Sequence, residues 1–305
     1  MRRAAFLAVV FVVSQGCQPR VPPPPAILPL DTDALAIGGI ERAQDTAERL
    51  VALAGVVGAF IGTREELNDT ARDGGLDRVV ERAELASAAC DAVIERDAAG
   101  AVHASWGEPC TLATGTVVTG GVSVTPWGDG DTLWVTVLAT ADGVTLNGLV
   151  GLTPQFWPVA WLMNDINSDV GFATVALFSE ETRVAPDDAG VFVIDLPSVM
   201  IFEIPWGSHV GAVGSRVCAP QGRTTILDGL ARRADQCAIA ASSIAATCYL
   251  VCAGVEGELG PVTGTVGFTV SPHTPGPVDV NLTESVDGHL EAHALSLELR
   301  PLGCR

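Results

Sequence analysis

Apolar residues recur at intervals of three and four between Ile37 and Ile61, which is the repeat of one face of an α-helix. The residues on this face are Ile37, Ile40, Ala43, Ala47, Leu50, Ala54, Val57 and Ile61. Asp31 or Asp33 can cap the start, because a short side-chain oxygen accepts a hydrogen bond from a free backbone N–H there. The pattern predicts a long helix whose apolar face must pack on another element.

Two shorter helical segments are predicted before residue 90. Thr63-Arg-Glu-Glu66 has the spacing of a capping box, which typically begins a helix. Residues 76–89 place Val79, Val80, Ala83 and Ala86 on one side. Residues 33–89 are therefore expected to form a helical region that packs on itself or on a sheet.

The pattern changes from helical to strand-like after Cys90. Residues 93–94 and 102–106 have strand composition and are separated by an Asp97 to Gly100 turn. Gly107 to Pro109 predicts a second turn before a strand over residues 111–125. Cys90 and Cys110 then flank one hairpin, so a disulfide between them is predicted.

From residue 123 onward, short strands alternate with Gly, Asp and Pro turns. The tight turns are Asp129-Gly130, Asp142-Gly143 and Asp187-Asp-Ala-Gly190. Further strands are expected at 171–178, 199–204, 262–270, 278–285 and 289–299. The chain is therefore predicted to be mainly β, as an antiparallel sandwich or open barrel with an N-terminal α-helical region, α+β overall.

The β-rich body is expected to span 90–305. Pro-Trp-Gly occurs after Thr125 and again after Ile204, which suggests two sub-lobes at 90–185 and 186–305. Residues 238–255 carry no charge, but their serine, threonine and cysteine residues favour a buried segment over a membrane-spanning helix.

The N-terminus has the pattern of a signal peptide. Met1-Arg-Arg3 is basic, residues 4–13 are apolar, and small residues precede Cys17. The apolar run is about half of the roughly 20 residues that a transmembrane helix needs. A signal peptide is expected at 1–16, and residues 17–32 are a proline-rich tether.

Ending at Gly16-Cys17, this segment resembles the lipobox of bacterial lipoprotein precursors, although Ser14 stands where that family usually has Leu, Val or Ile. The resemblance implies that Cys17 is acylated, becomes the new N-terminus and anchors the protein. Gln18 does not resemble the aspartate associated with inner-membrane retention, so outer-membrane residence is implied. More widely, residues 1–124 are similar to uncharacterised myxobacterial-type lipoproteins, a likeness that brings no catalytic residues.

Charge and cysteine content limit the possible functions. The formal net charge is −19 and every basic residue is arginine, so nucleic-acid partners, Schiff-base chemistry and a P-loop lysine are excluded. Seven cysteines besides Cys17 favour a disulfide framework in an oxidising compartment. The sequence leaves open how Cys218, Cys237, Cys248, Cys252 and Cys304 pair.

Metal-binding candidates are weak. Asp165, Asn167 and Asp169 resemble the start of a calcium loop, but glycine falls at the seventh position and Ala176 replaces the usual glutamate. His289, Glu291 and His293 alternate along a predicted strand, but leucines continue the same face. We therefore predict no metal, no cofactor and no catalytic residue.

The favoured function is a cell-envelope lipoprotein with a non-enzymatic structural or binding role, lipid-anchored at the outer membrane and facing the periplasm or the surface. Its expected partners are the bilayer, through Cys17, and an envelope protein or polysaccharide. The alternatives are a tethered extracellular hydrolase and a calcium-linked adhesion or carbohydrate-binding module.

Overall fold

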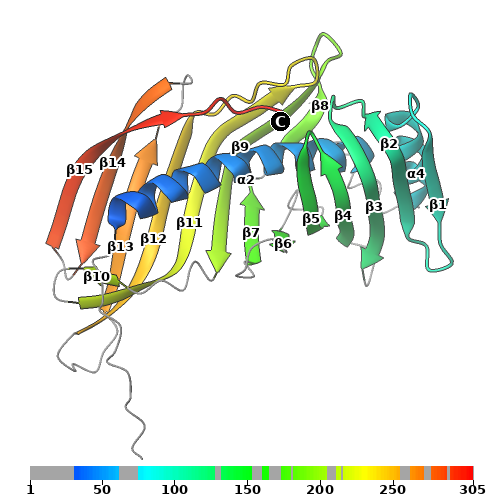
Figure 1. The fold of residues 1–305 in the computed structure, drawn as a ribbon. Coiled ribbons are helices and arrows are strands. Elements are labelled where there is room, and N and C mark those ends of the chain that lie inside the picture. The colour runs from blue at the N-terminus through cyan, green and yellow to red at the C-terminus, as the bar shows by residue number, and fades with distance from the viewer. Residues whose placement is uncertain are drawn as a thin grey trace, which may run out of the picture.

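A computed structural model describes residues 31–61, 75–127, 132–152, 160–164, 173–179, 181–204, 211–213, 216–254, 262–270, 276–286 and 289–304. The predicted capping box at Thr63, the turn at Asp129-Gly130, and the Cys17 tether lie outside these residues. The fold is mainly β with a helical N-terminal region, as predicted. Its strands belong to one hydrogen-bonded antiparallel sheet, and helix α2 lies across one face of it (Figure 1).

The sheet follows chain order almost without exception. Its path is β1-β2-β3-β4-β5-β6-β7-β9-β11-β12-β13-β14-β15, with β8 paired to β9 and β10 paired to β11. The strands are β1 (Ala92–Arg96), β2 (Val102–Thr111), β3 (Val117–Trp127), β4 (Thr132–Ala141), β5 (Val144–Leu152), β6 (Ala160–Asn164), β7 (Ala173–Phe178), β8 (Arg183–Pro186), β9 (Phe192–Ile204), β10 (Gly211–Val213), β11 (Arg216–Arg233), β12 (Ser243–Gly254), β13 (Val262–Val270), β14 (Gly276–Val286) and β15 (His289–Leu299). The two sub-lobes suggested by the sequence share this continuous sheet.

Helix α2 (Thr32–Ile61) begins at the predicted cap, where Asp31 Oδ1 accepts a hydrogen bond from the Ala34 backbone N–H at 2.9 Å. Its residues from Leu50 to Phe60 are buried on all sides, as expected of a helix that is apolar around its whole circumference. The shorter helix α4 (Gly75–Ala86) packs beside its C-terminal part and against β1 and β2.

Two glycines allow α2 to lie directly on its neighbours. A Cβ at Gly55 would lie 2.0 Å from Thr116 Oγ1, and a Cβ at Gly58 would lie 2.4 Å from Val184 Cγ1. Any larger residue would push the helix away from the turn before β3 and from β8. Small residues are therefore required where α2 meets the sheet.

Of the predicted turns that lie in the described chain, the one at Asp142-Gly143 is confirmed and the one at Gly107 to Pro109 is not. Asp142 and Gly143 both have positive φ, 49° and 81°, which is the geometry of a tight two-residue hairpin turn. The predicted turn at Gly107 to Pro109 is wrong, because β2 continues through it with a register shift between Trp106 and Cys110. The chain turns later, where the Leu112 N–H donates to the Thr116 carbonyl at 2.9 Å and Gly115 has φ 76°.

The uncharged segment 238–255 contains all of β12. Ile244 and Ala246 are buried, whereas Ala245 and Thr247 between them are partly exposed, so β12 is half-buried there. In the part of the chain described, no helix is long and apolar enough to cross a membrane.

Candidate binding surface

The two faces of the sheet differ in composition because strand side chains alternate. On β4, Leu133, Val135 and Val137 are buried toward α2, while Thr136 and Leu138 point the opposite way. We call the side away from α2 the outer face. The inner face supplies the core, and the outer face is the side of the sheet that α2 does not cover (Figure 1).

Charged residues are absent from the outer face of the hairpins β3–β5 in the described chain. Its residues there are Val117, Thr119, Gly121, Ser123, Thr125, Trp134, Thr136, Leu138, Thr140, Thr145, Asn147, Leu149 and Gly151. The whole protein has 36 acidic and 17 basic residues, so charge is plentiful elsewhere. This surface is composed of hydroxyls, one amide and apolar groups.

Cross-strand pairing extends this surface as a continuous row of paired residues, which we call the central rung. Ser123 pairs with Thr136, Thr136 with Leu149, Leu149 with Leu162, and Leu162 with Val175. The row then continues through Phe202, Thr224 and Thr247. Seven steps of about 4.8 Å give an uncharged row about 34 Å long, perpendicular to the strands.

Exposed apolar side chains gather on the same face. Six of the seven large hydrophobic residues that are exposed in the described chain lie there: Val93, Val117, Leu138, Leu177, Met200 and Tyr249. Leu138 is the most exposed of them at 60 %, and the seventh, Leu85, lies on α4. Exposed apolar groups gathered on one face typically mark a contact surface.

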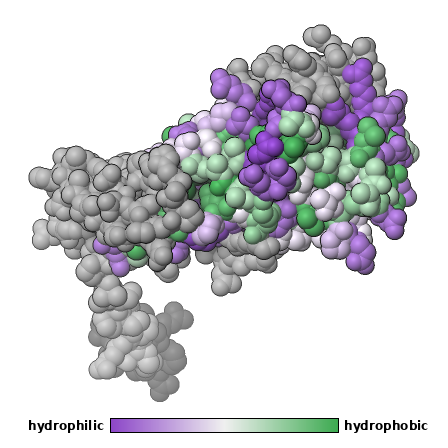
Figure 2. Space-filling model, turned by 90° about the horizontal axis from the view of Figure 1, so that it is seen from above, coloured by the Kyte–Doolittle hydropathy of each residue, from purple (hydrophilic) through white to green (hydrophobic). Residues whose placement is uncertain are grey.

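Charged groups on the outer face border the central rung or are bound locally. Beyond Ser123 the same row continues to His103, whose Nε2 lies 3.1 Å from Asp97 Oδ2, and then to Glu95. Asp228 on β11 accepts hydrogen bonds from Ser198 Oγ at 2.8 Å and from Ser243 Oγ at 2.9 Å. Seen from above, hydrophilic residues form clusters between apolar areas (Figure 2).

Buried charges form structural networks on the inner side. Glu203 on β9 makes an ion pair with Arg223 and lies 3.4 Å from Arg42 Nε of α2, while Arg223 Nη1 donates to the Gly39 carbonyl at 3.0 Å. A salt bridge also joins Arg232 to Asp142. These groups attach the helix and the turns to the sheet.

The C-terminal segment crosses α2 and is held by charge and by a disulfide. Arg300 makes ion pairs with Glu48 and, at 2.6 Å, with Asp45. Hydrogen bonding to Glu48 is the main cause that raises the pKa of Arg300. Cys304 is bonded to Cys237, so the segment 300–304, which we call the strap, is covalently attached to the segment that precedes β12.

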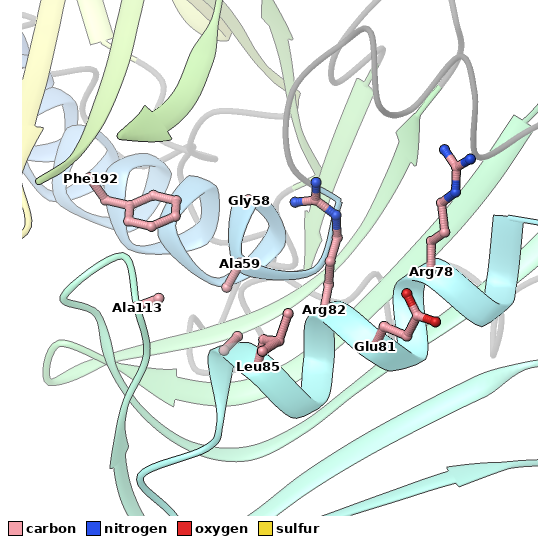
Figure 3. A pocket seen from close by; sticks show the side chains of 9 residues that line it. Gly58, Ala59, Arg78, Glu81, Arg82, Leu85, Ala113 and Phe192 are labelled. Carbon is pink, nitrogen blue, oxygen red and sulfur yellow. The ribbon is translucent and has the colours of Figure 1, made fainter. Parts of the chain in front are cut away.

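The cavities lined by described residues include one beside α2 and one beside the C-terminal disulfide. One, of about 490 Å³, lies between α2 and α4, with Phe192 at one end and Arg78 at the other (Figure 3). Leu85 and Arg82 of α4 also line it. The second, of about 390 Å³, adjoins the Asp142-Gly143 turn and the Cys237–Cys304 disulfide.

Of the predictions made for individual residues, one is confirmed, and the others concern residues or side chains outside the described ones. Cys90 and Cys110, the expected pair, are joined by a disulfide with Cα atoms 5.6 Å apart. Asp165, Asn167 and Asp169 lie outside the described residues, as does Cys17. The backbone of His289, Glu291 and His293 belongs to β15, but their side chains lie outside the described ones, so this candidate stays untested. Among the side chains that are described, no group of three or more His, Cys, Asp or Glu residues is suited to a metal.

Sequence reasoning identified strands around the outer face but did not recognise the surface. The alternation of small, hydroxyl and apolar residues in β3 was visible in the sequence. The alignment of Thr136, Val175 and Thr247 in one row depends on strand register, which single strands do not specify.

Comparison with protein-family models, curated proteins and solved structures finds no match for this chain.

Proposed function

We propose that the protein is a cell-envelope lipoprotein, anchored through acylated Cys17, with a non-enzymatic binding role. The partner is an uncharged envelope polymer that docks on the outer face of the sheet. The observation that carries the binding role is the absence of charge from the central rung in a protein of net charge −19. The lipobox-like sequence supports the anchor, and the two disulfides seen among the described residues are in keeping with an oxidising compartment.

The placement of the charged groups supports binding more than catalysis. An acid or base catalyst must reach a substrate, whereas the buried carboxylates Glu48, Asp142 and Glu203 each face an arginine inside the fold. Their interactions hold α2, the strap and the turns in place. This arrangement favours a rigid scaffold that presents a surface.

The anchor is tested by Cys17→Ser in the full-length precursor. The variant lacks the thiol that would be acylated, so we expect it to move from the membrane fraction to the soluble fraction, and its mass to lack the acyl groups. Pro19→Ala keeps the cysteine and serves as the matched control. If Cys17→Ser stays with the membranes as the control does, the protein is not anchored through this residue.

A further inference from the structure

We infer that the outer face binds an unbranched, uncharged polysaccharide that lies across the strands along the central rung. This inference rests on the proposed function and names the class of its partner. Four sets of observations support it: the hydroxyl groups, the apolar groups, the charge and the length of the row.

Hydroxyl side chains recur along the rung at fixed positions. Ser123, Thr136 and Thr247 each offer one donor and two acceptor sites, which is the hydrogen-bonding capacity of a sugar hydroxyl. The Thr224 hydroxyl already donates to the Tyr249 hydroxyl at 3.2 Å and keeps its acceptor sites. Thr119, Thr140 and Thr145 form a second aligned set on β3, β4 and β5. Because threonine has few rotamers, such groups lose little conformational entropy when a ligand binds.

Apolar groups lie between these hydroxyls. Leu149, Val175 and Phe202 occupy the rung, and Leu138 and Met200 are exposed beside it. A sugar ring has polar edges and an apolar C–H face, so it can place its edges on the threonines and its face on these side chains. The mixture suits a sugar polymer better than a lipid tail, which would leave the hydroxyls without partners.

The absence of charge on the rung and the length of the rung narrow the class of partner further. An acidic polymer would meet no cation on the rung, and the protein's net charge of −19 would repel it. A second copy of the chain would bring the same charge, so self-association through this face is also opposed. A row about 34 Å long matches an extended chain and not a small molecule.

The test measures depletion of the folded, soluble Cys17→Ser protein by microcrystalline cellulose and by curdlan, with polygalacturonic acid as the anionic comparison. We expect retention on at least one neutral polymer and none on the anionic one. Thr136→Asp and Leu138→Asp place a carboxylate on or beside the rung, and each should weaken retention about tenfold or more, equivalent to about 1.4 kcal/mol.

Leu85→Asp is the matched control, because Leu85 is 75 % exposed on α4, away from the outer face. It should bind as the parent does, and unchanged circular dichroism should show that all three variants fold. The inference is overturned if neither neutral polymer retains the parent, or if Thr136→Asp and Leu138→Asp bind as well as Leu85→Asp.

Ultracentrifugation distinguishes failure of this inference from failure of the proposed function. A dimer that Leu138→Asp dissociates, without polysaccharide retention, would assign the face to a second copy and overturn the polysaccharide. Membrane release of the Cys17→Ser variant is measured separately, so the test of the lipid anchor does not depend on the polysaccharide result.

Discussion

The inner and outer faces of the sheet are built from the same strands, yet different physical requirements explain which residues each face carries. On β5, Leu146 and Val150 are buried against α2, whereas Asn147 and Leu149 between them face outward. Burial explains the inner residues, because each apolar side chain removed from water stabilises the fold. Folding does not require an uncharged outer face, since charged residues are common on exposed strand positions. The difference between the two faces is the ground on which we propose a binding role for the outer face.

The largest effect is expected from a buried charge on the inner side. Arg232→Leu leaves Asp142 without its cationic partner in a buried site, so the free energy of unfolding should fall by about 3–5 kcal/mol. Urea denaturation measures the loss. Arg183→Leu makes the same change at an exposed position and should stay within about 0.5 kcal/mol. Equal midpoints for the two variants would contradict the structural role of the Arg232 network.

Replacing one leucine on each face of the sheet tests the difference between the two faces directly. Leu146→Ala removes a side chain that is 1 % exposed and should cost about 2–5 kcal/mol by creating a cavity. Leu138→Ala removes one that is 60 % exposed on the adjacent strand β4 and should change stability by about 0.5 kcal/mol or less. Thermal or urea unfolding of both variants measures the difference. Similar losses would mean that Leu138 belongs to a second core and that the outer face is not free.

The smallest effect is expected at the strand ends, where charges are exposed. The pKa of Asp187 is lowered, chiefly because its carboxylate accepts a hydrogen bond from the Val191 backbone N–H at 3.0 Å, and also by Arg233. A lowered folded-state pKa contributes stability that is complete above the unfolded value near 3.8 and is lost as the pH falls through the folded value. Asp187→Asn should therefore be less stable than the parent at pH 7, and the gap should close in acid. Unfolding midpoints measured from pH 7 down to pH 2 follow the gap, and a gap that does not narrow as the pH falls below 3.8 would rule out this cause.

Local sequence patterns were sufficient to predict much of the fold. The three-four repeat from Ile37 to Ile61 placed α2, and Asp31 caps it as expected. Asp142-Gly143 and Asp187 to Gly190 marked hairpin turns, since these residues favour the backbone that such turns need. Gly107 to Pro109 misled the prediction, because a bulge and a turn draw on the same residues and only the pairing with β3 distinguishes them.

The sequence by itself determined the class of fold, the presence of α2, the Cys90–Cys110 pair and the turns at Asp142-Gly143 and Asp187 to Gly190, because each depends on residues that are close along the chain. Only the tertiary structure decided the rest. Arg300 meets Glu48 across about 250 positions, and the central rung joins residues from eight strands. Such contacts depend on strand order and register, and a shift of one residue would exchange the two faces of a strand. The uncharged surface is therefore a property of the assembled sheet.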